Sequence, residues 1–120
     1  MILVDTSVWI THFRDGNSRL NKLLFDESVI CHPLIIGEIA CGYLKNRNEI
    51  ISLLKSLPET LHVENDEILQ FIDQRKLMGL GIGLIDIHLL ASSILSDALL
   101  WTLDKRLYKV ASMLNVFYWV

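Results

Sequence analysis

The sequence has no excess of basic residues, because 11 Lys and Arg stand against 14 Asp and Glu and give a net charge of -3. A nucleic-acid-binding protein usually carries a basic excess. Two alternatives therefore stay open. Either the partner is not a polyanion, or bound cations and a local basic patch compensate for the deficit.

Cysteine is also scarce, with Cys31 and Cys41 alone and no C-x-x-C or clustered Cys/His pattern. The usual ligand pattern of structural zinc is therefore absent. Two thiols without an export signal predict a reducing compartment and no disulfide, and we expect both side chains to line the core. The four histidines are scattered along the chain, and each is expected to be structural: His12, His32, His62 and His88.

Long hydrophobic runs are missing as well. No apolar run approaches the roughly 18 residues that span a bilayer, and the N-terminus lacks a basic leader followed by an apolar stretch. We expect a soluble, cytoplasmic protein with no membrane partner, folded as one domain over residues 1–120. Its 52% hydrophobic content exceeds what the core alone explains, so we also expect a face buried against a partner or a second copy.

Predicted strands and helices alternate along the chain. The strands are predicted at 1–4, 28–31, 61–63, 98–102 and 116–120. The helices are predicted at about 8–13, 20–27, 34–43, 46–57, 65–78, 86–96 and 104–114, with Pro33 and Asn46 at helix starts. This order predicts an α/β fold, a three-layer α/β/α sandwich around a mostly parallel sheet.

Three glycines lie close together at Gly79, Gly81 and Gly83. The segment is not a G-x-G-x-x-G fingerprint, and it follows a predicted helix rather than a strand. We therefore do not expect it to bind a nucleotide.

Three aspartates fall where a ligand site is expected. The carboxyl ends of parallel strands meet at one edge of a sheet. Asp5 ends the first predicted strand, Asp104 follows the fourth, and Asp86 begins the helix that leads into the fourth. Each precedes a helix, so each alone has the alternative role of an N-cap.

Glu38 lies in the strongly apolar helix predicted at 34–43. An ionised glutamate buried there without a partner would cost several kcal/mol, so it should meet a cation, a metal or a proton. Gly37 beside it costs about 1 kcal/mol relative to alanine, which the close approach of another backbone or a bulky substrate would explain. The alternative is a narrow polar stripe that brings Glu38 near Lys45.

Carboxylates that converge on one point repel one another and are tolerated when a divalent cation lies among them. Ligands that are all oxygen select Mg²⁺ or Mn²⁺. Such ions bridge phosphate oxygens and lower the pKa of a bound water. Asp5, Glu38, Asp86 and Asp104 therefore predict a site of phosphodiester hydrolysis.

Four segments resemble one known family in order and at family-like spacing. Met1-Ile-Leu-Val-Asp5-Thr-Ser-Val-Trp-Ile10 resembles the opening of PIN-domain ribonucleases, specifically VapC-type toxins. Gly37-Glu38-Ile39 with Gly42, Gly83-Leu-Ile-Asp86-Ile-His-Leu-Leu-Ala91 and Leu100-Trp-Thr102-Leu-Asp104-Lys-Arg-Leu107 are similar to its later segments. Leu107 departs from the pattern, since many members carry an aromatic residue there.

The resemblance implies endonucleolytic cleavage of RNA with Mg²⁺ or Mn²⁺, a homodimer and inhibition by a cognate antitoxin. Carried over position by position, it makes catalytic metal ligands of Asp5, Glu38, Asp86 and Asp104. Thr6 and Thr102 would hold these acids, or the waters of the metal, through their hydroxyl groups. The antitoxin would lay an apolar segment along the helices between Leu34 and Leu57.

RNA must approach this acidic chain through local basic residues, although an ordinary solvated helix face is the alternative for them. The candidates are Arg14, Lys105, Arg106 and Lys109, with Lys45 and Arg47 in addition. Three other functions stay open. A non-catalytic PIN-like module and a DNA or flap-type nuclease are two. The third, a receiver-type phosphoacceptor domain, would want paired acids after its first strand and a lysine after its last.

Overall fold

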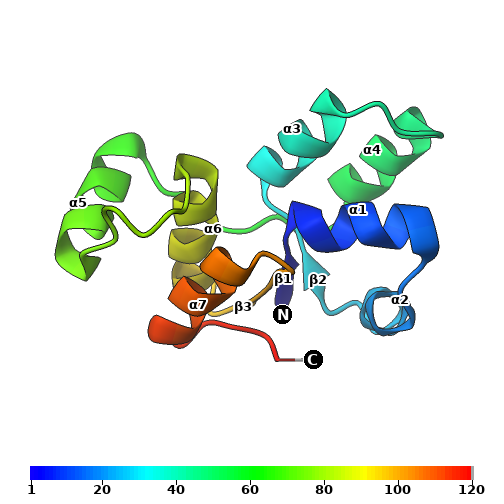
Figure 1. Cartoon of the computed structure of the whole chain (residues 1–120). Coiled ribbons are helices and arrows are strands. Elements are labelled where there is room, and N and C mark those ends of the chain that lie inside the picture. The colour runs from blue at the N-terminus through cyan, green and yellow to red at the C-terminus, as the bar shows by residue number, and fades with distance from the viewer. Residues whose placement is uncertain (120) are drawn as a thin grey trace.

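The computed structural model describes residues 1–119 and consists of short strands between helices (Figure 1). The strands are β1 (Ile2–Val4), β2 (Val29–Ile30) and β3 (Leu99–Trp101). The helices are α1 (Thr6–Asp15), α2 (Ser18–Phe25), α3 (Pro33–Cys41), α4 (Arg47–Ser56), α5 (Asn65–Arg75), α6 (Leu84–Leu95) and α7 (Lys105–Met113).

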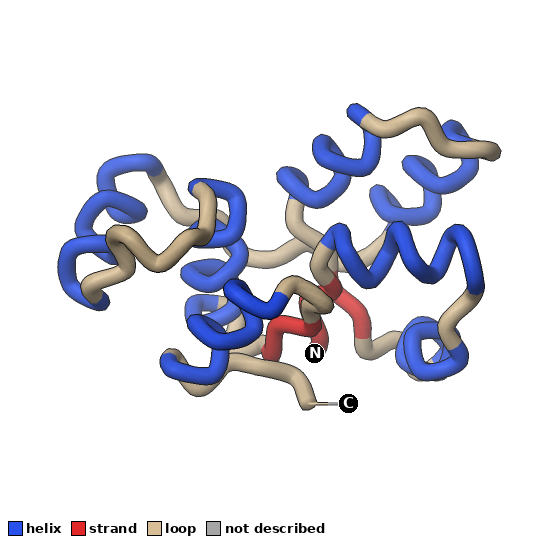
Figure 2. Tube along the Cα trace, in the orientation of Figure 1, coloured by secondary structure: helices blue, strands red, loops and turns tan. Residues whose placement is uncertain are grey.

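The sheet is parallel, with strand order β2-β1-β3. β1 is central because all three of its side chains are apolar and buried, as a strand covered on both faces requires. Leu3 pairs with Ile30 on one side and with Leu100 on the other. In Figure 2 the strands lie in the middle, with α1–α4 to one side and α5–α7 to the other. The predicted α/β fold is confirmed.

Two of the predicted strands are wrong. At 61–63 there is no strand, and one bridge between Cys31 and Glu59 precedes that segment. The backbone N–H of Leu61 donates instead to the Ser96 hydroxyl, at 3.0 Å, so the ladder stops. The predicted strand at 116–120 is reduced to one bridge between Leu100 and Phe117, and its last residue, Val120, lies outside the described residues.

The helix starts follow local capping chemistry. Pro33 is the first residue of α3, as predicted, and the Nδ1 atom of His32 accepts from the Leu34 N–H at 3.0 Å. Asn46 does precede α4, but its side chain makes no capping bond. The start of α6 differs from the prediction. It begins at Leu84 after Gly83, so Asp86 lies within the first turn rather than in front of it.

The core fills the space between the sheet and the helices. Leu3, Trp9, Leu90 and Leu100 are fully buried there. Cys31 is buried, as predicted, whereas Cys41 at the end of α3 is exposed, so the expectation that both cysteines line the core is wrong for Cys41. Within residues 1–119, no helix has the length and apolar character needed to cross a membrane.

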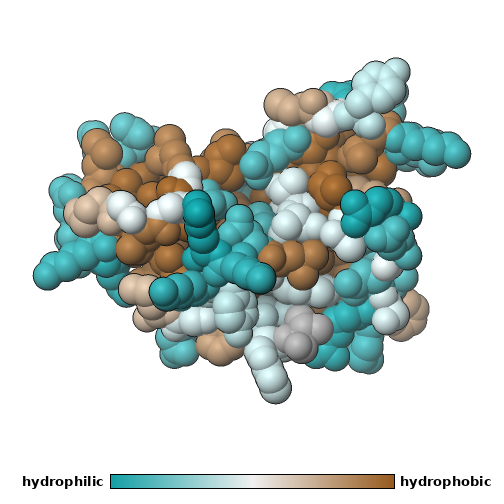
Figure 3. Space-filling model, viewed as in Figure 1, coloured by the Kyte–Doolittle hydropathy of each residue, from teal (hydrophilic) through white to brown (hydrophobic). Residues whose placement is uncertain are grey.

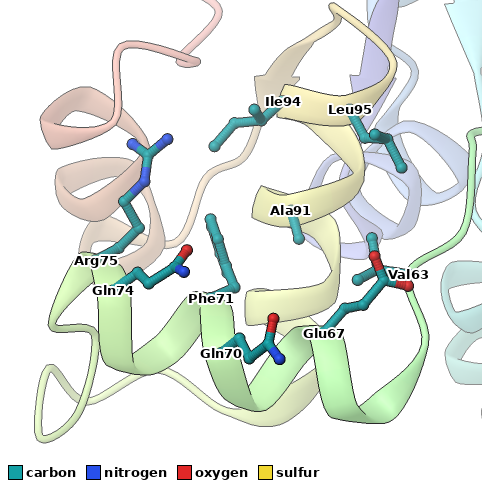
Figure 4. A pocket seen from close by; sticks show the side chains of 9 residues that line it. All are labelled: Val63, Glu67, Gln70, Phe71, Gln74, Arg75, Ala91, Ile94 and Leu95. Atoms are coloured by element: carbon teal, nitrogen blue, oxygen red, sulfur yellow. The ribbon is translucent and has the colours of Figure 1, made fainter.

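A groove of about 260 Å³ lies between α5 and α6. Figure 4 shows Phe71 of α5 pointing toward Ala91 and Ile94 of α6, with Gln70 and Gln74 along the same helix. None of the acids predicted to form the active site lines this groove.

Candidate active site

Asp5 lies at the carboxyl end of β1 and is 6% exposed. It occupies the N-cap position of α1, but its side chain makes no capping hydrogen bond. Its Oδ2 atom instead accepts from the hydroxyl groups of Ser7 and Thr102, each at 2.7 Å. The alternative role of a helix cap is therefore wrong for Asp5.

The two hydroxyl groups are themselves oriented by the backbone. Ser7 Oγ accepts from the Leu103 N–H and Thr102 Oγ1 accepts from the Asp104 N–H, both at 3.0 Å. Because each hydroxyl accepts on one side, its proton is free to point at Asp5, and chained bonds of this kind strengthen one another. Ser7 is not among the residues predicted from the sequence. Its position two residues after Asp5 is the signal that identifies it.

Asp104 is the N-cap of α7, so the alternative role of a helix cap is correct for this aspartate. Its Oδ1 atom accepts from the N–H groups of Arg106 at 2.8 Å and Leu107 at 3.1 Å. Among residues 1–119 its Oδ2 atom receives no hydrogen bond. One oxygen thus fixes the carboxylate and the other is open to a ligand.

The raised pKa of Asp86 indicates that the other predicted acids lie nearby. Its Oδ2 atom accepts from the Gly83 N–H at 3.3 Å. Burial raises the pKa of Asp86 most, and the negative charges of Asp5, Asp104 and Glu38 raise it further, against the opposing effect of the Gly83 bond. All four predicted acids therefore share one electrostatic neighbourhood.

Glu38 lies on α3, and its carboxylate is exposed rather than buried. The buried faces of α3 are formed by Ile35 and Ile39, which leaves Gly37 and Glu38 on the solvent side. Thr6 Oγ1 donates to Glu38 Oε1 at 2.7 Å, and Lys45 is not its partner in the described structure. No atom lies within 4 Å of where a Gly37 Cβ would be, so the close approach of another backbone does not explain that glycine.

The fold thus gathers Asp5, Glu38, Asp86 and Asp104, contributed by α3 and by the starts of α1, α6 and α7. In the view of Figure 3, which is that of Figure 1, hydrophilic residues lie toward the middle, between hydrophobic areas over the two groups of helices. A set of donors that is all carboxylate suits a hard cation such as Mg²⁺. Over residues 1–119, however, no three acidic, His or Cys side chains form a ready metal-binding group. The acids are neighbours, but they are not closed into a coordination shell.

Three of the histidines, His32, His62 and His88, lie close together in the structure. The ring of His32 lies 5.6 Å from that of His62 and 6.2 Å from that of His88, between centroids. Burial, followed by the charges of these two neighbours, lowers the pKa of His32 to about 4. No spacing in the sequence signals this cluster, because residues from three separate segments form it. His12 lies apart, where its Nδ1 atom accepts from the Asn17 N–H at 3.0 Å.

The predicted RNA-binding cations divide into two places. Lys105 and Arg106 are in the first turn of α7, directly after Asp104, and Lys109 is one turn later. Arg14 lies at the opposite end of α1 from Asp5, about 13 Å along the helix, and pairs with Asp15 at 3.1 Å.

Comparison with known proteins agrees with the geometry. The family model for the PIN domain matches residues 2–113, and the chain belongs to the PIN-domain family. It is also similar to "Ribonuclease VapC32" of Mycobacterium tuberculosis, from strain CDC 1551 / Oshkosh and from strain ATCC 25618 / H37Rv. Each is 47% identical over 108 residues, which cover 89% of this chain and 87% of the relative. The resemblance to VapC-type PIN domains is confirmed.

Proposed function

We propose that this chain is an endoribonuclease and the toxin of a toxin–antitoxin pair. The observation that carries the proposal is the buried carboxylate of Asp5, held by two hydroxyl groups within the electrostatic reach of three other acids. The similar proteins of Mycobacterium tuberculosis are named as ribonucleases, which supports RNA as the substrate class.

The four carboxylates would hold Mg²⁺ or Mn²⁺. When bound, such an ion activates a water and offsets the charge of the phosphodiester. The chain's own residues do the positioning. Ser7 and Thr102 orient Asp5, Thr6 orients Glu38, and backbone N–H groups orient Asp104. A neighbouring carboxylate would take the proton of the attacking water. The new P–O bond would form as the P–O3′ bond breaks, so one product would carry a 5′-phosphate and the other a 3′-hydroxyl that takes up a proton. Cyclic-phosphate ends, which need the 2′-hydroxyl as nucleophile, would refute the mechanism.

The basic residues at the start of α7 are proposed to bring RNA to the acids. Lys105, Arg106 and Lys109 lie within two turns of Asp104, whereas Arg14 would meet a more distant part of the strand. Binding through phosphates weakens with added salt, so a flat salt dependence would count against all four.

The antitoxin is proposed to dock along the helices between Leu34 and Leu57, on the side where they meet α1. Two hollows lie there, one with Phe13, Ile50 and Leu53 in its lining and one beside Tyr43. Tyr43 is fully exposed and Leu53 is 44% exposed, so an apolar segment of a partner would cover them. We also propose the homodimer that the family resemblance implies, which sedimentation of the purified chain tests.

One observation favours a second candidate, a PIN-like interaction module without catalysis. It is the lack of a closed group of three metal ligands within the described residues. Absence of RNA cleavage, whether or not Mg²⁺ or Mn²⁺ binds, would support this candidate over the nuclease.

The deciding experiment maps the cleavage ends that the purified chain produces on total cellular RNA. We expect new 5′-phosphate ends with Mg²⁺ or Mn²⁺, and none with Asp5→Asn. Asp15→Asn is the matched control, since Asp15 is an exposed aspartate that pairs with Arg14 at the far end of α1. Equal cleavage by the wild type and Asp5→Asn, or no cleavage by the wild type with either ion, would overturn the proposal.

A further inference from the structure

The segment with three glycines, which has no nucleotide-binding fingerprint, is in contact with a basic residue near the acids. A Cβ atom on Gly81 would lie 3.0 Å from Arg106 Cδ, 3.2 Å from Nη1 and 3.4 Å from Nε. The three atoms nearest to this Cβ position therefore all belong to the Arg106 side chain. The side chain of Arg106 lies along the Gly81 main chain.

Glycine is required at this position for two reasons. The φ angle of Gly81 is +78°, which favours glycine over residues with a side chain. In addition, any side chain would press on Arg106. Gly79 separates the two effects, because its φ angle is +72° but no atom lies within 4 Å of its Cβ position.

The charge of Arg106 is not neutralised by the acids around it. The backbone N–H of Arg106 donates to Asp104 Oδ1, and the Gly81 segment leads directly into the helix that carries Asp86. Yet Arg106 forms no ion pair with any residue in the range 1–119. The groups that shift the pKa of Asp86 likewise include no basic side chain. The Arg106 side chain therefore lies against Gly81 and outside ion-pair distance of these carboxylates.

We propose that the Gly81 backbone is a seat that keeps Arg106 beside the acids as a binding site for a phosphate group of the RNA strand. A planar guanidinium binds phosphate oxygens through two parallel N–H groups, which a lysine ammonium does not match. Within residues 1–119 the guanidinium forms no ion pair, so its N–H groups are available to such a ligand. This inference rests on the proposed function, and it assigns the phosphate contact to one of the four candidate cations.

Direct binding tests the arginine. A short fluorescent single-stranded RNA of mixed sequence is titrated with the protein in the Asp5→Asn background, so that nothing is cut. We expect Arg106→Ala to weaken binding about tenfold and Arg106→Lys to restore only part of it. Lys55→Ala is the matched control, because it removes one positive charge from an exposed lysine of α4 that is not among the candidate RNA-binding residues. It should change the affinity by about twofold or less.

A pair of glycine variants tests the seat. Gly79→Ala and Gly81→Ala introduce similar backbone strain, but only the second displaces Arg106. We expect Gly81→Ala to weaken RNA binding several-fold, Gly79→Ala to leave it near the wild-type value, and Gly81→Ala to add nothing in an Arg106→Ala background. Circular dichroism confirms that each variant is folded.

The outcomes separate the two proposals. If Asp5→Asn binds RNA and the wild type cleaves it, but Arg106→Ala binds as tightly as Lys55→Ala, the phosphate site is wrong and the nuclease stands. Equal effects of the two glycine variants would overturn the seat. If the chain neither binds nor cleaves RNA, the proposed function fails, and the phosphate site fails with it.

Discussion

Replacing Thr102 by valine would test how the site holds its buried carboxylate. Thr102 is 7% exposed, and its hydroxyl group donates to Asp5 at 2.7 Å while it accepts from the Asp104 N–H at 3.0 Å. Valine has nearly the same shape but no hydroxyl. Asp5 would keep one hydrogen bond, from Ser7, and the Asp104 N–H would lose its partner.

The magnitude follows from these two losses. A hydrogen bond to a charged group contributes about 1.5–3 kcal/mol, and an unpaired buried donor costs a comparable amount. The added methyl group recovers part of this through burial. We expect Thr102→Val to lower the free energy of unfolding by about 2 kcal/mol. In an Asp5→Asn background the bond is no longer charged, so the same substitution should cost about 1 kcal/mol less.

Urea unfolding followed by tryptophan fluorescence provides the assay, because Trp9 and Trp101 are buried in the core. Thr102→Ser keeps the hydroxyl and should remain close to the wild type. If Thr102→Val proves as stable as the wild type, or if Thr102→Ser loses as much as Thr102→Val, then the hydroxyl bond does not hold Asp5 as described.

Two further predictions concern protons and cations. The pKa of His32 is lowered to about 4, against 6.5 in the unfolded chain, so the unfolded state takes up a proton first as the pH falls. The free energy of unfolding should therefore drop by about 2 kcal/mol between about pH 6.5 and pH 4, with allowance for water around the half-exposed His62. His32→Asn keeps a capping acceptor but does not titrate. Urea unfolding at a series of pH values should therefore show a weaker dependence of its stability on pH. Mg²⁺ or Mn²⁺ should raise the melting temperature by several degrees, because a bound cation offsets the burial and the negative charges of Asp5, Asp104 and Glu38 that raise the pKa of Asp86. Thermal scans of Asp86→Asn should show little of this shift, and an equal shift in both proteins would contradict the shared cation site.

The position of Asp5 could be predicted because the preceding strand leaves no ambiguity. Ile2–Val4 is apolar at every position, which fits a central strand, and a residue that follows such a strand lies at the ligand-binding edge of a parallel sheet. The same reasoning places Asp104 after β3. The role of each aspartate was not predictable, because both precede a helix. Asp104 caps its own helix through local N–H groups, whereas Asp5 accepts a hydrogen bond from Thr102, 97 positions away in the chain.

The exposure of Glu38 was not predictable from the composition of α3. Its neighbours are nearly all apolar, yet the helix buries Ile35 and Ile39 and turns Glu38 outward. Hydrophobic content averages around a helix, whereas exposure depends on which side packs against neighbouring elements, which for α3 are α1 and α4. The histidine cluster was missed for a similar reason, since it is formed by contacts between distant segments.

The predicted strand at 61–63 failed because a short apolar run does not by itself provide a pairing partner. The Cys31 N–H donates to the carbonyl of Pro58, and the Cys31 carbonyl accepts from the Thr60 N–H. The next residue, Leu61, then donates to Ser96 instead of to a strand. Strand propensity describes a side chain, but pairing depends on neighbours that the local sequence does not contain.

The bond between Asp5 and Thr102 joins residues 97 positions apart. During synthesis, β1 leaves the ribosome first, but its neighbour β3 and the Thr102 hydroxyl follow only after α6 is complete. A nascent or truncated chain that stops at α6 therefore has three of the four acids and no partner on one side of β1. The cluster is completed late in translation, and contacts of such long range are also those that slow folding most.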